Sequence, residues 1–178
     1  MDLEHMRLLY AYNSWANARL LDQADKLTAE QLLASNPGGF GSVRDTLVHL
    51  METEFFWSGL IWPGKAIDID WEPYEFHATD YPDMATIRAR WAAVESDLRE
   101  YIDTLTPDGE NSLEQIIVWT DGDETRLTRA LWLSMLDVFI HATQHRSEIA
   151  MALSRFGHSP GELDLSRYVR ERQQDAAA

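Results

Sequence analysis

The sequence predicts an all-α protein: a four-helix bundle with a small β-hairpin and one long aromatic loop between helices. Four long segments repeat apolar residues at the spacing of amphipathic helices. Helix interiors exclude proline, and the six prolines all fall outside these segments, at Pro37, Pro63, Pro73, Pro82, Pro107 and Pro160. Four such helices with few competing strands are typical of a helical bundle.

The first two predicted helices lie in the N-terminal third of the chain. The first covers residues 3–26 and carries an apolar stripe of Met6, Leu9, Ala16, Leu20 and Ala24. The second begins at Ser42, and Asp45 three residues later makes a weak capping-box pattern. We expect this second helix to continue until Pro63-Gly64 stops it.

The other two predicted helices follow Pro82. The third covers residues 83–105, and its apolar seam of Met84, Ile87, Trp91, Val94, Leu98 and Leu105 should face other helices. The fourth covers residues 128–156, with Gly157 as a C-terminal cap.

Two connections and the C-terminus have a different composition. Residues 62–82 hold five aromatic residues among acids and prolines, so we expect a loop packed over the bundle that could form a wall of a pocket. In residues 114–127, an Asp121-Gly122 step between two strand-like runs indicates a tight hairpin. Residues 1–169 are expected to form one domain, and residues 170–178 a frayed polar tail.

Composition excludes several classes of function. The net charge is −15 and the only lysines are Lys26 and Lys65, so nucleic acid and anionic membrane surfaces are disfavoured partners. The chain has no cysteine, which excludes disulfides, thiolate ligands and a protein thiol nucleophile. No signal peptide or membrane-spanning run is visible, and we expect a cytoplasmic protein.

The candidate functional residues are three histidines on predicted helices. His141 and His145 are four residues apart on the fourth helix, where one face can hold a single metal ion. His49 lies on an inward face of the second helix. Two alternatives remain open: a metal site built from all three, or half-buried histidines with hydrogen-bonded partners. Ala142 follows His141, so the zinc-protease motif is absent.

Several motifs resemble the DinB/YfiT-like metalloprotein superfamily over nearly the whole chain. Tyr12 to Leu21 is similar to the Trp-Ala-Asn-x-x-Leu-Leu motif of that family's first helix. The segment Ser42 to Leu50 resembles the one that carries its first histidine. The run His141-Ala142-Thr143-Gln144-His145-Arg146 matches its His-x-x-x-His-Arg element, and Gly157 to Asp164 resembles its Gly-x-x-Pro…Asp ending.

The resemblance implies a four-helix bundle, a divalent-metal site at His49, His141 and His145, and commonly a homodimer. Nickel and zinc are the metals usually associated with such sites. Some relatives are S-transferases or isomerases that use a low-molecular-weight thiol. One departure bears on the lining below the metal: Ser147-Glu148 stands where many relatives have Gly-Gln.

Other polar residues near these histidines have two interpretations each. Glu52 is a candidate catalytic base toward water or a thiol, or a solvated helix charge. Asp45 and Asp137 precede His49 and His141 by one turn, but helix-surface carboxylates are the favoured interpretation. For Trp15 and Asn17 we favour core packing and an interhelical hydrogen bond over a position beside the pocket.

Two functional hypotheses follow from the sequence. The first is a metal-dependent enzyme that activates water or an exogenous thiol at the three histidines and acts on a small-molecule substrate. The second is a non-catalytic, metal-stabilised dimeric module for binding or stress response. We treat the remaining histidines, at His5, His77 and His158, as surface residues.

Overall fold

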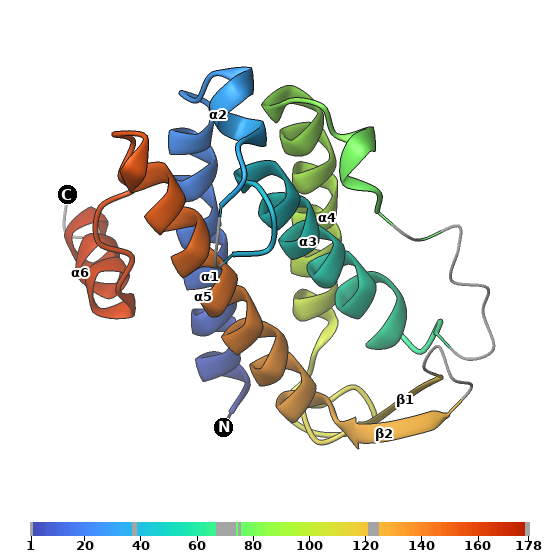
Figure 1. Cartoon of the computed structure of the whole chain (residues 1–178). Coiled ribbons are helices and arrows are strands. Elements are labelled where there is room, and N and C mark those ends of the chain that lie inside the picture. Colours follow the sequence, from blue (N-terminus) through green and yellow to red (C-terminus); the bar gives the residue numbers. More distant parts are fainter. Residues whose placement is uncertain (1, 37–38, 67–73, 75, 121–124, 177–178) are drawn as a thin grey trace.

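The computed structural model describes residues 2–36, 39–66, 74, 76–120 and 125–176. This part of the chain is mostly helical, with a small two-stranded antiparallel sheet, which confirms the helical prediction (Figure 1). Its elements are α1 (Leu3–Ala24), α2 (Ala29–Leu33), α3 (Val43–Phe55), η1 (Phe56–Ile61), η3 (Ala78–Asp80), α4 (Met84–Thr104), β1 (Ile116–Thr120), β2 (Arg126–Ala130), α5 (Leu131–Arg155) and α6 (Leu165–Asp175).

The four long helices pack around a common apolar interior. α1 contacts both α4 and α5, and α3 contacts the same two helices, so each long helix has two long neighbours. Buried side chains from all four meet in this interior, among them Leu20, Leu47, Trp91 and Ile149. The sheet lies at the N-terminal end of α5, where β2 leads directly into that helix (Figure 1). Within the described residues, no helix is long and apolar enough to cross a membrane.

Side-chain caps explain where several helices begin. At α3, Ser42 Oγ accepts from the Asp45 backbone N–H at 3.1 Å, and Asp45 Oδ2 accepts from the Ser42 N–H at 3.0 Å. This reciprocal pair confirms the capping box suggested by the sequence. α5 ends at Arg155, and the positive φ of Gly157, 82°, reverses the chain after it. Glycine adopts this conformation at no steric cost, as expected for a C-terminal cap.

The predicted second helix changes its geometry part of the way along. α3 ends at Phe55, and the π-helix η1 continues to Ile61 with wider turns. The Trp62 N–H bonds to the Trp57 carbonyl five residues back, at 2.8 Å. The Trp62 indole N–H then reaches Ser134 Oγ at 3.0 Å in the buried interior. Apolar periodicity does not distinguish such a π segment from an α-helix, because both bury one face.

The hairpin prediction is confirmed for its strands. β1 and β2 pair antiparallel, with Ile116 opposite Ala130 and Thr120 opposite Arg126. The predicted Asp121-Gly122 turn lies outside the described residues. Because residues 128–130 belong to β2, α5 begins at Leu131, three residues later than the predicted fourth helix.

The aromatic loop contacts the helices through its described residues. Phe76 stacks on Phe55 of α3 with ring centroids 5.2 Å apart, and the Arg90 guanidinium of α4 lies 4.8–5.0 Å from the centroids of the same two rings. The ring centroids of Tyr81 and Phe76 lie 5.7 Å apart. Trp71 falls outside the described residues. At Phe76 the described part of the loop therefore lies against α3 and α4, and its backbone N–H donates to Glu52.

The prediction of a frayed tail was wrong for residues 170–175, and residues 177–178 lie outside the described part of the chain. Residues 170–175 are the second half of α6, which lies against α1 (Figure 1). Tyr168 is buried against Tyr12 and Trp15, with ring centroids 6.0 and 5.6 Å apart. The Trp15 indole N–H donates to Glu171 Oε2 at 3.0 Å. Tyr168 is the one buried side chain of α6, so the composition of this helix is almost entirely polar.

Candidate metal centre

Three histidines from two helices converge on one point. His49 comes from α3, and His141 and His145 come from α5. One ring nitrogen of each lies within 4.8 Å of those of the other two. The Nε2 atom of His141 lies 3.3 Å from Nε2 of His49 and 3.1 Å from Nε2 of His145. The structure therefore brings together all three histidines that the sequence selected.

The nitrogen spacing fits a divalent cation. Histidine nitrogens lie about 2.0–2.1 Å from zinc in a tetrahedral site, which places two of them roughly 3.3 Å apart. The two measured separations, 3.3 and 3.1 Å, agree with that geometry. Imidazole donors suit zinc, nickel, copper and iron, and three of them leave at least one coordination position for another ligand. The three residues can hold such a metal.

Glu148 orients the His145 ring. Its Oε2 atom lies 2.8 Å from Nδ1 of His145, which is buried at 6% exposure. A carboxylate accepts the proton on Nδ1, and the lone pair of Nε2 then points toward the other two histidines. In the sequence, Glu148 stands out only as a departure from the family motif. Its position three residues after His145 on a helix could have identified this contact.

His141 lies between the other two rings and is held as a neutral imidazole. Burial lowers the pKa of His141 below its usual value of 6.5, and the neighbouring His145 and His49 rings lower it further. Its Nδ1 atom is buried and has no hydrogen-bond partner among the described residues. The ring nitrogen that remains available to a ligand is therefore Nε2, which faces the Nε2 atoms of His49 and His145. A neutral ring with a free Nε2 lone pair is the form that ligates metals.

Glu52 lies beside His49 and is held in place by the aromatic loop. Its Oε2 atom is 3.8 Å from His49 Nδ1, and its Oε1 atom accepts from the Phe76 backbone N–H at 3.1 Å. Burial raises the pKa of Glu52, but the His49 ring and the Phe76 N–H outweigh burial and hold this pKa below the usual 4.5. Glu52 is therefore a carboxylate at neutral pH. Only 27% of its side chain is exposed, so it is not a freely solvated helix charge.

Phe40 is a component of the site that the sequence analysis missed. Its ring stacks on His49 with centroids 4.1 Å apart and an interplanar angle of 19°. The same ring meets the His145 ring edge to face, with centroids 5.9 Å apart and an interplanar angle of 75°. Phe40 is nevertheless 51% exposed, so it presents an apolar surface next to the histidines. A lone phenylalanine before a helix has no spacing that would have singled it out.

The other candidates contact partners elsewhere. Asp45 bonds to Ser42 and Arg44, and Asp137 pairs with Arg129 at 2.9 Å. Asn17 makes the interhelical hydrogen bond favoured above, to Glu54 of α3, and Trp15 packs in the aromatic cluster with Tyr168. These contacts agree with the favoured interpretations of the four residues.

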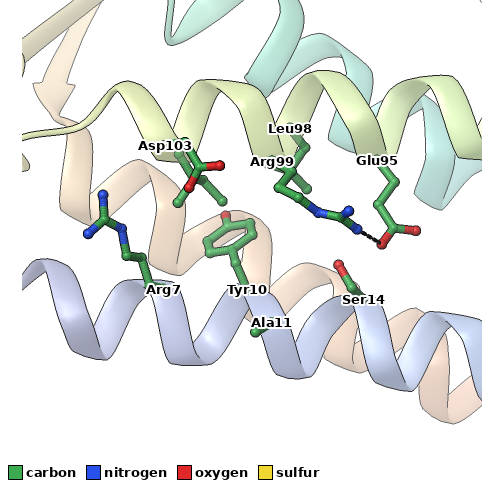
Figure 2. A pocket seen from close by; sticks show the side chains of 9 residues that line it. Arg7, Tyr10, Ala11, Ser14, Glu95, Leu98, Arg99 and Asp103 are labelled. Atoms are coloured by element: carbon green, nitrogen blue, oxygen red, sulfur yellow. Dashed lines mark hydrogen bonds and ion pairs between the residues drawn. The ribbon is translucent and has the colours of Figure 1, made fainter.

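A separate pocket lies between α1 and α4 (Figure 2). Its volume is about 220 Å³, and Arg7, Ser14, Arg99 and Asp103 lie around a floor formed by Tyr10. Its two arginines are engaged: Arg99 pairs with Glu95 on the same helix at 3.0 Å, and Arg7 donates to the Leu105 backbone carbonyl. None of the three histidines lines this pocket, so we place the candidate site at the histidines.

Comparison with known proteins agrees with this geometry. No curated protein matches the chain. The model of the DinB family matches residues 2–176, which is nearly the whole chain and includes all three histidines. The chain therefore belongs to the DinB family.

Proposed function

We propose that this protein is a DinB-like four-helix bundle that binds a divalent metal ion at His49, His141 and His145. We further propose that it is a metal-dependent enzyme that activates water or a low-molecular-weight thiol there, in the manner of an S-transferase. One observation carries the proposal: three histidine nitrogens from α3 and α5 face one another at the spacing of metal ligands.

The protein side chains have separate tasks in this proposal. A bound divalent cation would lower the pKa of water or of a thiol by Lewis acidity. The histidine rings hold the cation, and Glu148 fixes the orientation of His145. Glu52 accepts a proton at Oε2, the oxygen nearest to His49, while its Oε1 stays bonded to Phe76. Phe40 excludes water from one face of the His49 ring.

The composition supports a thiol that comes from outside the protein. The chain contains no cysteine, so thiol chemistry at this site needs a cosubstrate. Neutral nitrogen ligands suit both nickel and zinc, and these two metals are our candidates. Three protein ligands leave room for a thiolate or a water molecule in the coordination shell.

We also propose a homodimer in which two helices per subunit pack across a two-fold axis. Three apolar side chains on α5 support it: Leu133, Ile140 and Met151 are 44%, 58% and 60% exposed. Their separations of seven and eleven residues place them on one face of the helix. Light scattering should report twice the mass of one chain, and a monomer would contradict this part of the proposal.

Elemental analysis of gently purified protein tests the metal site. Wild type should contain close to one nickel or zinc ion per chain, and the double variant His49→Ala/His145→Ala should contain little. The matched control is His5→Ala, because His5 pairs with Asp2 at the exposed start of α1. Equal metal content in the wild type and the double variant would remove the basis of the proposal.

The second candidate function is a non-catalytic, metal-stabilised module that binds a small ligand. A thiol-depletion assay with an electrophilic acceptor, run over several biological thiols, separates it from the enzyme. Metal-dependent turnover that is lost in Glu52→Gln but kept in Glu100→Gln, an exposed position on α4, supports the enzyme. Metal binding without turnover for every thiol supports the module.

A further inference from the structure

Four polar residues lie together in the apolar interior, and two of them, Glu54 and Arg146, are close to the site histidines along the chain. Asn13 and Asn17 come from α1, Glu54 from α3 and Arg146 from α5, and each is only 2% exposed. We call these four residues the asparagine-bridged cluster. A carboxyl and a guanidinium so deeply buried carry a large desolvation cost unless they are fully hydrogen-bonded.

The two asparagines connect the carboxyl to the guanidinium. Glu54 Oε1 accepts from Asn13 Nδ2 at 2.6 Å and from Asn17 Nδ2 at 2.9 Å. On the other side of each amide, Arg146 Nη1 donates to Asn13 Oδ1 and to Asn17 Oδ1. The Nη2 atom of Arg146 donates to Thr143 Oγ1 at 2.8 Å. Each amide therefore uses its donor toward α3 and its acceptor toward α5.

This arrangement requires amide side chains at both positions of α1. An amide carries a donor NH₂ and an acceptor oxygen on the same carbon. Neither a carboxylate nor a hydrocarbon side chain offers both. Aspartate at position 17 would face Glu54 with a second carboxyl, and alanine would leave Glu54 and Arg146 each short of a partner. Buried polar groups without partners destabilise the folded state.

The cluster joins the same two helices that supply the metal ligands. Arg146 follows His145 directly on α5, and Glu54 comes five residues after His49 on α3. α1 contributes no histidine to the site, yet its amides join the other two helices. Polar networks of this kind add little to stability compared with an apolar core of the same shape. What hydrogen bonds of fixed length and direction do supply is one defined spacing between helices.

We infer that Asn13, Asn17, Glu54 and Arg146 act as positioning residues that set the spacing of α3 and α5, and with it the separation of His49 from His141 and His145. The inference rests on the proposed metal-binding function, because its consequence is the geometry of that metal site. Residues that orient metal ligands typically change metal affinity about 10- to 100-fold when they are removed. The cluster does not contact the metal, but it should change metal affinity in the same way, because it changes the positions of the histidine ligands.

The test compares cluster variants with a control of equal burial. Asn17→Ala removes one bridge, and Glu54→Gln keeps the acceptor oxygen. Arg146→Lys keeps the charge but loses the planar guanidinium, whose Nη1 donates to both amides while Nη2 donates to Thr143. The control is Ser134→Ala: Ser134 is fully buried on α5 and accepts from the Trp62 indole at 3.0 Å, away from the cluster. Co²⁺ affinity and the visible Co²⁺ spectrum report on the site, and urea unfolding reports on stability.

A metal-free measurement reads the spacing directly. The chain has no cysteine, so nitroxide labels can be placed uniquely at Thr53→Cys on α3 and Gln144→Cys on α5. We expect Asn17→Ala and Arg146→Lys to broaden the distance distribution between these labels. The same variants should weaken Co²⁺ binding about 10- to 100-fold and alter its spectrum. Glu54→Gln should stay closer to wild type in both measurements, and Ser134→Ala should change only stability.

The outcomes separate the inference from the proposed function. Unchanged distance distributions in Asn17→Ala and Arg146→Lys would overturn the inference, whether or not the metal binds. So would a loss of Co²⁺ affinity in Ser134→Ala as large as that in the cluster variants. If wild type binds no Co²⁺, nickel or zinc, the proposed function fails, and the labelled proteins still decide whether the cluster sets the spacing of the helices.

Discussion

The carboxylate of Glu148 lies 2.8 Å from Nδ1 of His145, three residues further along α5. The contact leaves Nε2 of His145 free to face Nε2 of His141, 3.1 Å away. Carboxylate–histidine pairs of this kind fix the tautomer and raise the basicity of a metal ligand. Glu148 is not one of the three histidines, yet it determines which nitrogen of His145 is available to bind a metal.

Replacing Glu148 with alanine should weaken metal binding. The His145 ring would lose the acceptor for its Nδ1 proton, so its orientation and its tautomer would no longer be defined. We expect about a 10- to 100-fold lower affinity for zinc by competition with a chelator. The control is Glu100→Ala on the exposed face of α4. Equal affinities for Glu148→Ala and Glu100→Ala would contradict this role.

Removing the metal should lower thermal stability. A ligand that binds only the folded state stabilises it by about 2.7 kcal/mol when its concentration is 100 times Kd. Wild type should therefore melt at a lower temperature after chelation and recover when zinc or nickel is restored. His49→Ala should melt at one temperature under all three conditions, and His5→Ala should respond as the wild type does. A chelator effect of equal size in His49→Ala would place the metal elsewhere.

The ionisation of Glu54 should make stability depend on pH. Burial raises the pKa of Glu54 above its usual 4.5, although the amides of Asn13 and Asn17 act against that rise. In the window between 4.5 and the raised value, the folded state binds more protons than the unfolded state. The contribution of Glu54 is then fully present below pH 4.5 and is lost as pH rises through the raised pKa.

The variant Glu54→Gln lacks this ionisation and isolates its effect. The free energy of unfolding of the wild type, relative to that of Glu54→Gln, should decline as pH increases from 4.5. Urea unfolding of both proteins across pH 4.5–8 measures the difference. Parallel curves for the two proteins would show that Glu54 keeps an ordinary pKa in the fold.

The capping box of α3 should contribute measurable stability to the helix that carries His49. Ser42→Ala removes the acceptor for the Asp45 N–H, and such losses cost about 0.5–2 kcal/mol. Urea unfolding at neutral pH measures the loss. Thr28→Ala, at the cap of the five-residue helix α2, is a comparison on an element that carries no site residue. We expect the metal affinity of both variants to remain that of wild type once they are folded.

Docking of α6 should depend on Tyr168. Tyr168→Ala would remove the ring that packs on Tyr12 and Trp15, and truncation of a buried aromatic side chain costs about 3–5 kcal/mol. Hydrogen exchange in α6 should speed up, while metal content should stay unchanged because α6 carries none of the three histidines. Protection of α6 amides equal to wild type would show that other contacts dock this helix.

The sequence by itself determined the four long helices and the three histidines. Apolar residues at helical spacing, prolines confined to the connections and the Ser42–Asp45 pair are local signals that need no knowledge of neighbours. The family motifs around His49 and the pair His141 and His145 are local as well. Each was therefore visible in a single stretch of chain.

Tertiary structure alone decided how those stretches meet. Periodicity tells which face of a helix is buried but not which partner covers it, so the convergence of His49 with His141 could not be derived from spacing. The stacking of Phe40 on His49 and the bridging of Glu54 and Arg146 by two amides of α1 depend on side chains far apart in sequence. The helix α6 was missed for the same reason. Tyr168 stands in a polar stretch of sequence, and only its packing against Tyr12 and Trp15 shows that it is buried. Local patterns select the candidates, and long-range packing sets the distances on which their chemistry depends.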